Sequence, residues 1–291
     1  MTGLTVEVED LSVHYGDIRA VDHATFTLPA GSITGLLGRN GSGKSTLLSA
    51  LASMLPPTSG RILVDGEEPF ENEALMERIC LVRESGDLMP DERISTNLAY
   101  VATARPTWDD DLAGRLLDSF EIDPRSKPRQ LSRGGRSALG VVVGLASRAP
   151  LTMLDEVYLG MDAPSRYQFY ELLLEDYVEH PRTIILSSHL IRELDRLLEH
   201  VVVLHEGRPL LTGSADDLRA HGATLTGRAE DVDAAASGLT VLAERHLGPT
   251  KQTTVMDGLD AAQAAAMARS GVEIGPVDLQ DLFVHLTGRT Q

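Results

Sequence analysis

The stretch Gly38-Arg39-Asn40-Gly41-Ser42-Gly43-Lys44-Ser45-Thr46 is the most informative part of the sequence, because it combines a phosphate-binding loop with the elements that such a loop requires. It matches the pattern G-x-x-x-x-G-K-[ST]. The apolar run 33–37 before it has the composition of a buried strand, and residues 46–51 after it have helical spacing. Glycines let backbone N–H groups turn toward phosphate oxygens, and the next helix offers its positive N-terminal end to the same anion. The sequence therefore predicts a strand, a phosphate-binding loop and a helix in succession.

Two side chains at the end of this loop have expected partners on a bound nucleotide. Lys44 is expected to reach the β- and γ-phosphates of a nucleoside triphosphate. The Ser45 hydroxyl is the expected protein ligand of Mg²⁺. ATP and Mg²⁺ are therefore the predicted cofactors.

Composition restricts the class of protein. The 291 residues carry a formal net charge of −17, which argues against a nucleic-acid partner, because such partners are met by basic surfaces. The single cysteine, Cys80, excludes an internal disulfide framework and is typical of a reducing cytoplasm. We expect no signal peptide, and no apolar run reaches the about 18 residues that span a bilayer. Any membrane span would belong to another polypeptide.

Periodicity along the chain predicts an α/β fold. The apolar residues Val6 and Val8, and later Ala24, Phe26 and Leu28, alternate with polar residues, as in half-buried strands of an antiparallel sheet. The short apolar runs 151–154 and 183–186 are expected to form buried parallel strands. Helical spacing lies between and after them, at 167–177 and 190–198. We predict one domain over residues 1–221, with a mostly helical part at about 84–149, and a small accessory region at 222–291.

Two carboxylates follow the strand 151–154. Asp155 stands where an acidic residue after a buried strand holds Mg²⁺ through water, opposite the phosphate-binding loop. Because successive residues of a strand point to opposite sides, Glu156 need not repeat that role. It is the candidate general base that polarises the attacking water.

Taken together, these motifs resemble the nucleotide-binding subunits of ABC transporters, most closely the bacterial ABC-2 exporter type, over residues 4–215. Each motif is short, but their order and spacing are highly specific. The further matches are the signature-like Leu131-Ser132-Arg133-Gly134-Gly135, the D-loop-like Leu159-Gly160-Met161-Asp162, the switch-like Ser188-His189, and Tyr15, which resembles an adenine-stacking aromatic residue.

This resemblance implies a P-loop NTPase core with an N-terminal antiparallel piece and an inserted helical subdomain. In the family, two such domains pack head to tail around ATP. The resemblance implies that Ser132 and Gly134 contact the γ-phosphate held by the partner, and that Asp162 relays geometry between the two sites. It further implies that His189 holds the γ-phosphate and orients the water, and that Tyr15 stacks on adenine.

Three positions depart from the family pattern. The glutamine expected as a Mg²⁺ ligand aligns with Glu84, whose carboxylate can also ligate Mg²⁺. Arg133 replaces the first glycine of the signature, and Gly135 replaces its glutamine. Val157-Tyr158 stands where the family usually has Pro-Thr, a difference that the sequence alone does not explain.

The leading hypothesis is the ATP-hydrolysing subunit of an exporter, in the cytoplasm on the inner face of the membrane. Its expected partners are separate transmembrane permease subunits and a second nucleotide-binding subunit, with a homodimer as the expected pairing. Two alternatives stay open: a soluble ABC ATPase that acts on a macromolecular complex, and an ATP-binding regulatory module with weak hydrolysis. The sequence does not identify the cargo.

Overall fold

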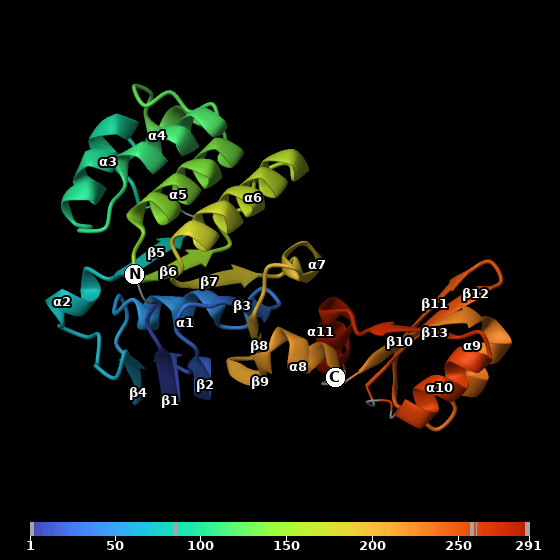
Figure 1. Ribbon diagram of the computed structural model, residues 1–291. Coiled ribbons are helices and arrows are strands. Elements are labelled where there is room, and N and C mark those ends of the chain that lie inside the picture. The colour runs from blue at the N-terminus through green and yellow to red at the C-terminus, as the bar shows by residue number, and fades with distance from the viewer. Residues whose placement is uncertain (1–2, 84–86, 221, 257–258, 260, 289–291) are drawn as a thin grey trace. The chain divides into compact units, whose positions relative to one another are not determined.

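The structure is a computed structural model that describes residues 3–83, 87–220, 222–256, 259 and 261–288 (Figure 1). Its contacts divide the chain into two compact units. Unit 1 comprises Met1–His189 and Leu204–Pro209, and unit 2 comprises Leu190–Val203 and Leu210–Gln291. The boundary after residue 221 stays a prediction, because this division follows contacts rather than a single point in the chain.

The N-terminal part of unit 1 is an antiparallel sheet of order β2-β1-β4. Residues of β2 alternate between buried and exposed from Asp22 to Leu28, because this sheet covers the core with one face. The alternation predicted at Val6 and Val8 and at Ala24, Phe26 and Leu28 is therefore confirmed. The strands are β1 (Val6–Tyr15), β2 (Ile18–Leu28) and β4 (Ser59–Val64).

A six-stranded sheet of order β5-β6-β7-β3-β8-β9 carries the phosphate-binding loop. Strands β5, β6, β7 and β3 are parallel neighbours. Every residue of β3, β6 and β7 is buried, as expected of strands covered on both faces. The strands are β3 (Ile33–Gly38), β5 (Ile79–Arg83), β6 (Leu151–Asp155), β7 (Thr183–Ser188), β8 (His200–His205) and β9 (Arg208–Ser214).

Helices cover the parallel strands of unit 1. Figure 1 shows α5 and α6 on one side of β6 and β7, and α1 on the other. The predicted helical part contains α3, α4 and α5, which pack together. The helices of unit 1 are α1 (Lys44–Leu51), α2 (Glu73–Met76), α3 (Ile94–Thr103), α4 (Asp110–Ser119), the 3-10 helix η1 (Pro128–Gln130), α5 (Arg133–Ser147) and α6 (Ala163–Glu179).

The helix predicted over residues 190–198 is much shorter in the structure. It is α7 (Ile191–Leu194), whose C-cap is Asp195. The carbonyl oxygen and the carboxylate of Asp195 accept hydrogen bonds from Arg219, and the Leu197 N–H turns back to the Leu194 carbonyl. These contacts replace the next helical turn, so the prediction was wrong in length.

Unit 2 contains a four-stranded antiparallel sheet of order β11-β12-β10-β13. Its elements follow each other as strand, helix, strand, strand, helix, strand, which is the split βαβ arrangement of ferredoxin-like folds. Its core includes Leu225, Val232 and Val255. The remaining elements of unit 2 are α8 (Ala215–Ala220), β10 (Ala223–Arg228), α9 (Ala229–Ala236), β11 (Val241–Leu247), β12 (Thr250–Val255), α10 (Ala261–Arg269), β13 (Glu273–Pro276) and α11 (Leu279–Gly288).

Candidate nucleotide-binding and hydrolysis site

The phosphate-binding loop connects β3 to α1. The backbone of Ala20 and of Gly207 packs against this loop. Gly43 has φ 102°, and a Cβ at this position would lie 2.2 Å from the Ala20 carbonyl oxygen. Only glycine fits there. The Gly207 N–H donates to the Ser42 carbonyl at 3.0 Å, and the Asp22 N–H donates to the Gly207 carbonyl at 2.9 Å. The turn between β8 and β9 therefore supports the loop, a contact that sequence reasoning missed.

Lys44 lies buried inside this loop. Its Nζ donates to the Gly38 carbonyl at 2.9 Å and to the Arg39 carbonyl at 3.2 Å. The same Nζ lies 3.2 Å from Oε1 of Glu156. Lys44 and Glu156 come from segments more than a hundred residues apart, so the fold brings together two of the predicted residues.

Parallel strands explain why these groups meet. Asp155 ends β6 and pairs in register with Ser187 of β7, while Ser188 pairs with Leu37 of β3. Because adjacent parallel strands end at one edge, the residues after them share a crevice there. His189 follows β7, and its Nδ1 lies 3.4 Å from Oε2 of Glu156.

Glu156 occupies a special backbone position. Its φ is 49°, in the left-handed region that non-glycine residues rarely adopt. This conformation begins the turn after β6 and directs the chain into Val157–Gly160. The Glu156 side chain is only 13% exposed, and it lies between the cationic Lys44 and the imidazole of His189. The carboxylate is thus held between two of the side chains that the sequence predicts at the phosphates.

Oxygen atoms suitable for a hard cation line the same edge. Asp155 is buried, and its Oδ1 has no hydrogen-bond partner among the described residues. Ser45 is exposed at the first turn of α1. A carboxylate and a hydroxyl are ligands that Mg²⁺ accepts while it keeps waters and phosphate oxygens in its shell. These residues fit the cation. Glu84, the third predicted ligand, lies outside the described residues.

The signature-like segment forms the start of α5 and packs on the D-loop-like turn. Ser132 is the N-cap of α5, and its Oγ accepts a hydrogen bond from the Gly135 N–H at 3.0 Å. A Cβ on Gly134 would lie 2.8 Å from the Gly160 carbonyl oxygen, and a Cβ on Gly160 would lie 2.6 Å from Cγ of Arg133. The aliphatic part of Arg133 thus covers the turn.

Asp162 and Tyr15 lie elsewhere in unit 1. Asp162 caps α6, where its Oδ1 accepts a hydrogen bond from the Ser165 N–H at 3.0 Å. Hydrogen bonding by Ser165 holds the pKa of the Asp162 carboxyl below its usual value. Tyr15 ends β1 beside a tight turn and is 51% exposed, so its ring face is accessible. The predicted loop residues Arg39, Asn40 and Gly41 are exposed, and Thr46 is half-buried.

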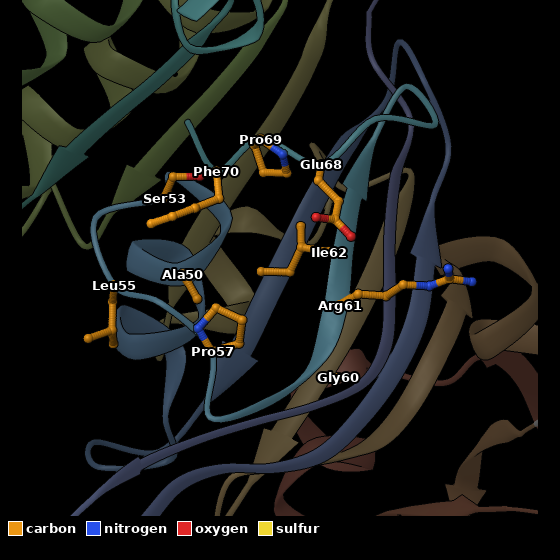
Figure 2. Close-up of a pocket in the computed structure, with 10 residues that line it drawn as sticks. All are labelled: Ala50, Ser53, Leu55, Pro57, Gly60, Arg61, Ile62, Glu68, Pro69 and Phe70. Carbon is orange, nitrogen blue, oxygen red and sulfur yellow. The ribbon is translucent and has the colours of Figure 1, made fainter. Parts of the chain in front are cut away.

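A separate pocket in unit 1 has dimensions that exclude a nucleotide. Figure 2 shows this pocket between the end of α1 and β4, with Ala50, Ile62 and Phe70 among its lining residues. Its volume is about 80 Å³. Ligand sites for molecules of nucleotide size measure roughly 300–1,000 Å³. This pocket therefore holds a few waters at most.

The fold and the residues at the edge of the parallel sheet define an ATP-binding P-loop protein. Comparison with known proteins narrows this class. Residues 21–158 match the family model described as "ABC transporter". The Nod factor export ATP-binding protein I of Cupriavidus metallidurans is 30% identical over 288 residues, which cover 94% of this chain and 94% of that protein. A probable sulfate/thiosulfate import ATP-binding protein CysA of Chlorella vulgaris is 30% identical over 223 residues, 75% of this chain and 94% of that protein.

Solved structures agree with this family. The ATP-binding subunit of an ABC transporter superposes with a TM-score of 0.66 at 27% identity, covering 74% of this chain and 91% of that one. The dimeric ABC transporter cassette MJ0796 superposes with a TM-score of 0.64 at 21% identity, covering 72% of this chain and 98% of that one. The chain belongs to the ATP-binding subunits of ABC transporters, and it is an ATPase of that family. No helix within the described residues has the length and apolar character needed to span a membrane.

Proposed function

We propose that this chain hydrolyses ATP at the edge formed by β3, β6 and β7, and that this hydrolysis drives export through separate membrane subunits. The observation that supports this proposal is the position of Glu156. Its two carboxylate oxygens lie 3.2 Å from Lys44 and 3.4 Å from His189. A carboxylate between a phosphate-binding lysine and a histidine is suited to water activation next to a γ-phosphate.

In this proposal each residue has one role in the reaction. Lys44 and the backbone N–H groups of residues 38–46 bind the phosphates. Ser45 and Asp155 would hold Mg²⁺, which would supply positive charge against the charge that develops on the phosphates. Glu156 accepts a proton from water as the water oxygen bonds to the γ-phosphorus. The bond from that phosphorus to the bridging oxygen breaks, which yields ADP and phosphate. His189 holds the γ-phosphate, and Tyr15 stacks on the adenine.

The second part of the proposal is a head-to-tail dimer. Ser132 and Gly134 lie at the exposed N-terminal end of α5, a 15-residue helix whose dipole favours an anion. We propose that this end closes over ATP held by a second copy, and that Asp162 joins the two sites. The dimeric cassette with the same fold supports this arrangement. ATP would then stabilise the closed pair, because these contacts need the γ-phosphate.

The third part concerns the membrane partner. A cavity of about 460 Å³ lies in unit 1, and the residues that line it include Leu88, Val101 and Leu139. Charged side chains, among them Asp87 and Arg105, also line it. We propose that a short cytoplasmic segment of a membrane subunit binds here, which would keep the chain on the inner face of the membrane. The export-type relative that covers nearly the whole chain supports the direction of transport.

Phosphate release from ATP tests the catalytic part. The purified chain should release phosphate only with Mg²⁺ present, and Lys44→Ala should abolish this release together with ATP binding. Light scattering with a nonhydrolysable analogue should report a dimer. A chain that remains monomeric with the analogue, even after the membrane subunit is added, would contradict the head-to-tail arrangement.

A second experiment tests the membrane part. The tagged chain should co-purify with one membrane polypeptide from its native host, and that polypeptide should raise its ATP turnover. Leu88→Asp in the cavity should remove both effects, whereas Val178→Asp, at a 75% exposed site on α6, should leave them intact. Recovery of RNA or a soluble complex instead would favour the soluble ABC ATPase. Slow turnover in every condition would favour the regulatory module.

A further inference from the structure

Tyr158 connects the turn after β6 to the end of β7. It is only 3% exposed, and its hydroxyl donates a hydrogen bond to Oγ of Ser188 at 2.7 Å. The same hydroxyl accepts a hydrogen bond from the backbone N–H of His189 at 3.3 Å. The Tyr158 and His189 rings also lie near each other, with centroids 6.4 Å apart and planes inclined by 45°. One phenol therefore contacts the last residue of β7 and the histidine after it.

These contacts are more specific than those of an ordinary core tyrosine. A buried hydroxyl normally finds a partner, but here it both donates and accepts across two segments that are 30 residues apart. Ser188 is fully buried, so its position is set by the sheet. The hydroxyl of Tyr158 thus links the buried Ser188 side chain, at the end of β7, to the backbone N–H of His189.

The imidazole of His189 needs such support. Its Nδ1 lies 3.4 Å from Oε2 of Glu156, yet this nitrogen has no hydrogen-bond partner among the described residues. The carboxylate alone therefore does not fix the orientation of the ring. Two contacts with Tyr158 hold His189: the hydrogen bond from the His189 backbone N–H to the phenol oxygen, and the approach of the two rings.

We propose that Tyr158 is a positioning residue that holds His189 in register with Glu156 for hydrolysis. This inference rests on the catalytic roles proposed above for Glu156 and His189. It gives a physical meaning to the departure at Val157-Tyr158, because a threonine is too short to make both contacts of the phenol. The turn that carries Tyr158 begins at Glu156 itself, whose carbonyl accepts the Leu159 N–H at 3.0 Å. The base and the positioning residue therefore belong to one hydrogen-bonded turn.

The kinetic consequence is a selective loss of turnover. Tyr158→Phe keeps the ring but removes the hydroxyl, so His189 loses its bond while the phosphate-binding loop keeps all its contacts. A displacement of 1 Å at a reacting group can cost about 100-fold in rate, and a loosened group costs less. We expect kcat to fall about 10-fold, and the KM for ATP to stay within about 2-fold of the unaltered chain.

Tyr177→Phe is the matched control. Tyr177 is a half-buried tyrosine of the same unit, and its hydroxyl donates to the Gly31 carbonyl at 2.5 Å. Its removal deletes one tyrosine hydrogen bond without a direct effect on His189, so kcat should not change. If the role of Tyr158 were only structural, Tyr158→Phe and Tyr177→Phe would have the same kcat per folded molecule.

The decisive measurement places Tyr158→Phe in a His189→Ala background and follows single-turnover hydrolysis of radiolabelled ATP. Because Tyr158 acts through His189, the second substitution should then cost less than about 2-fold. An unchanged kcat for Tyr158→Phe alone, a parallel rise in KM, or an equal loss in both backgrounds would overturn the inference. Should Tyr158→Phe not fold, Ser188→Ala removes the acceptor and should lower kcat in the same His189-dependent way.

The outcomes also separate this inference from the proposed function. If His189→Ala keeps full turnover, the role proposed for His189 fails, and the inference fails with it. If His189→Ala loses turnover while Tyr158→Phe keeps it, only the positioning role of Tyr158 fails.

Discussion

Replacement of Glu156 by glutamine isolates the chemical step from nucleotide binding. The amide has the same shape as the carboxylate and fits the same space, where the side chain is 13% exposed. Lys44 keeps its hydrogen bonds to the Gly38 and Arg39 carbonyls. The free energy of unfolding should therefore change by about 1 kcal/mol or less, the size of one hydrogen bond. What disappears is the proton acceptor 3.4 Å from His189.

General-base catalysis typically contributes about 10²–10⁴-fold, so kcat of Glu156→Gln should fall by about that factor. ATP affinity should stay the same or increase, since a negative charge next to the γ-phosphate is removed. With binding intact and cleavage blocked, scattering should detect an ATP-bound dimer that persists. The measurements are phosphate release, equilibrium binding of a fluorescent ATP analogue, and scattering with ATP. Glu171→Gln, an exposed carboxylate on α6, is the charge-matched control. Turnover of Glu156→Gln within about 2-fold of the unaltered chain would refute the role of Glu156.

Three further substitutions test the supports of the fold. Gly43→Ala puts a Cβ 2.2 Å from the Ala20 carbonyl oxygen, on a residue with φ 102°. The free energy of unfolding, measured with urea, should fall by about 3 kcal/mol. A fall of less than about 1 kcal/mol would contradict the close approach. The hydrogen bond from Arg208 holds the pKa of the Asp22 carboxyl below its usual value, so its stabilising effect is present above about pH 4 and is lost as pH falls through the lowered pKa. Unfolding of Asp22→Asn should accordingly depend less on pH below 4, and an unchanged acid dependence would remove Asp22 from this linkage. Asp281→Ala removes the buried carboxylate that pairs with the half-exposed guanidinium groups of Arg192 and Arg245. The free energy of unfolding should fall by about 1–2 kcal/mol, and hydrogen exchange in α11 should become faster. Unaltered exchange would show that these ion pairs do not stabilise unit 2.

The sequence predicted the parts of the site that depend on local pattern. The glycines and Lys44 of the loop lie within one strand-loop-helix segment, and their spacing alone implies the backbone that they form. Asp155 and His189 could be predicted to converge because each follows an apolar strand, and parallel strands end at a common edge. The distances from Glu156 to Lys44 and His189 agree with that reasoning.

Other contacts that support the site join residues far apart in the chain, so no local sequence pattern predicts them. The Gly207 turn reaches the loop across more than 160 residues, and the partner of Asp22 is Arg208 at a separation of 186 residues. The ferredoxin-like sheet of unit 2 was missed for another reason. In β10 the buried Leu225 stands between Thr224 and Thr226, so the strand presents a polar second face and too few apolar residues to predict it.

The backbone of Glu156 links these observations. A left-handed residue costs about 1–2 kcal/mol outside glycine, and it persists only where surrounding contacts over-determine it. Here those contacts are the buried turn that continues to Tyr158, the bond from that phenol to Ser188, and the packing of Gly160 under Arg133 and Gly134. The same turn therefore places the candidate base, contacts the candidate histidine and packs against the start of α5. If α5 closes on a second copy as proposed, a shift of its N-terminus would act directly on Gly160, and through this short turn on Glu156. Closure and water activation would then be coupled within one segment of five residues, 156–160, with no need for a longer path through the protein.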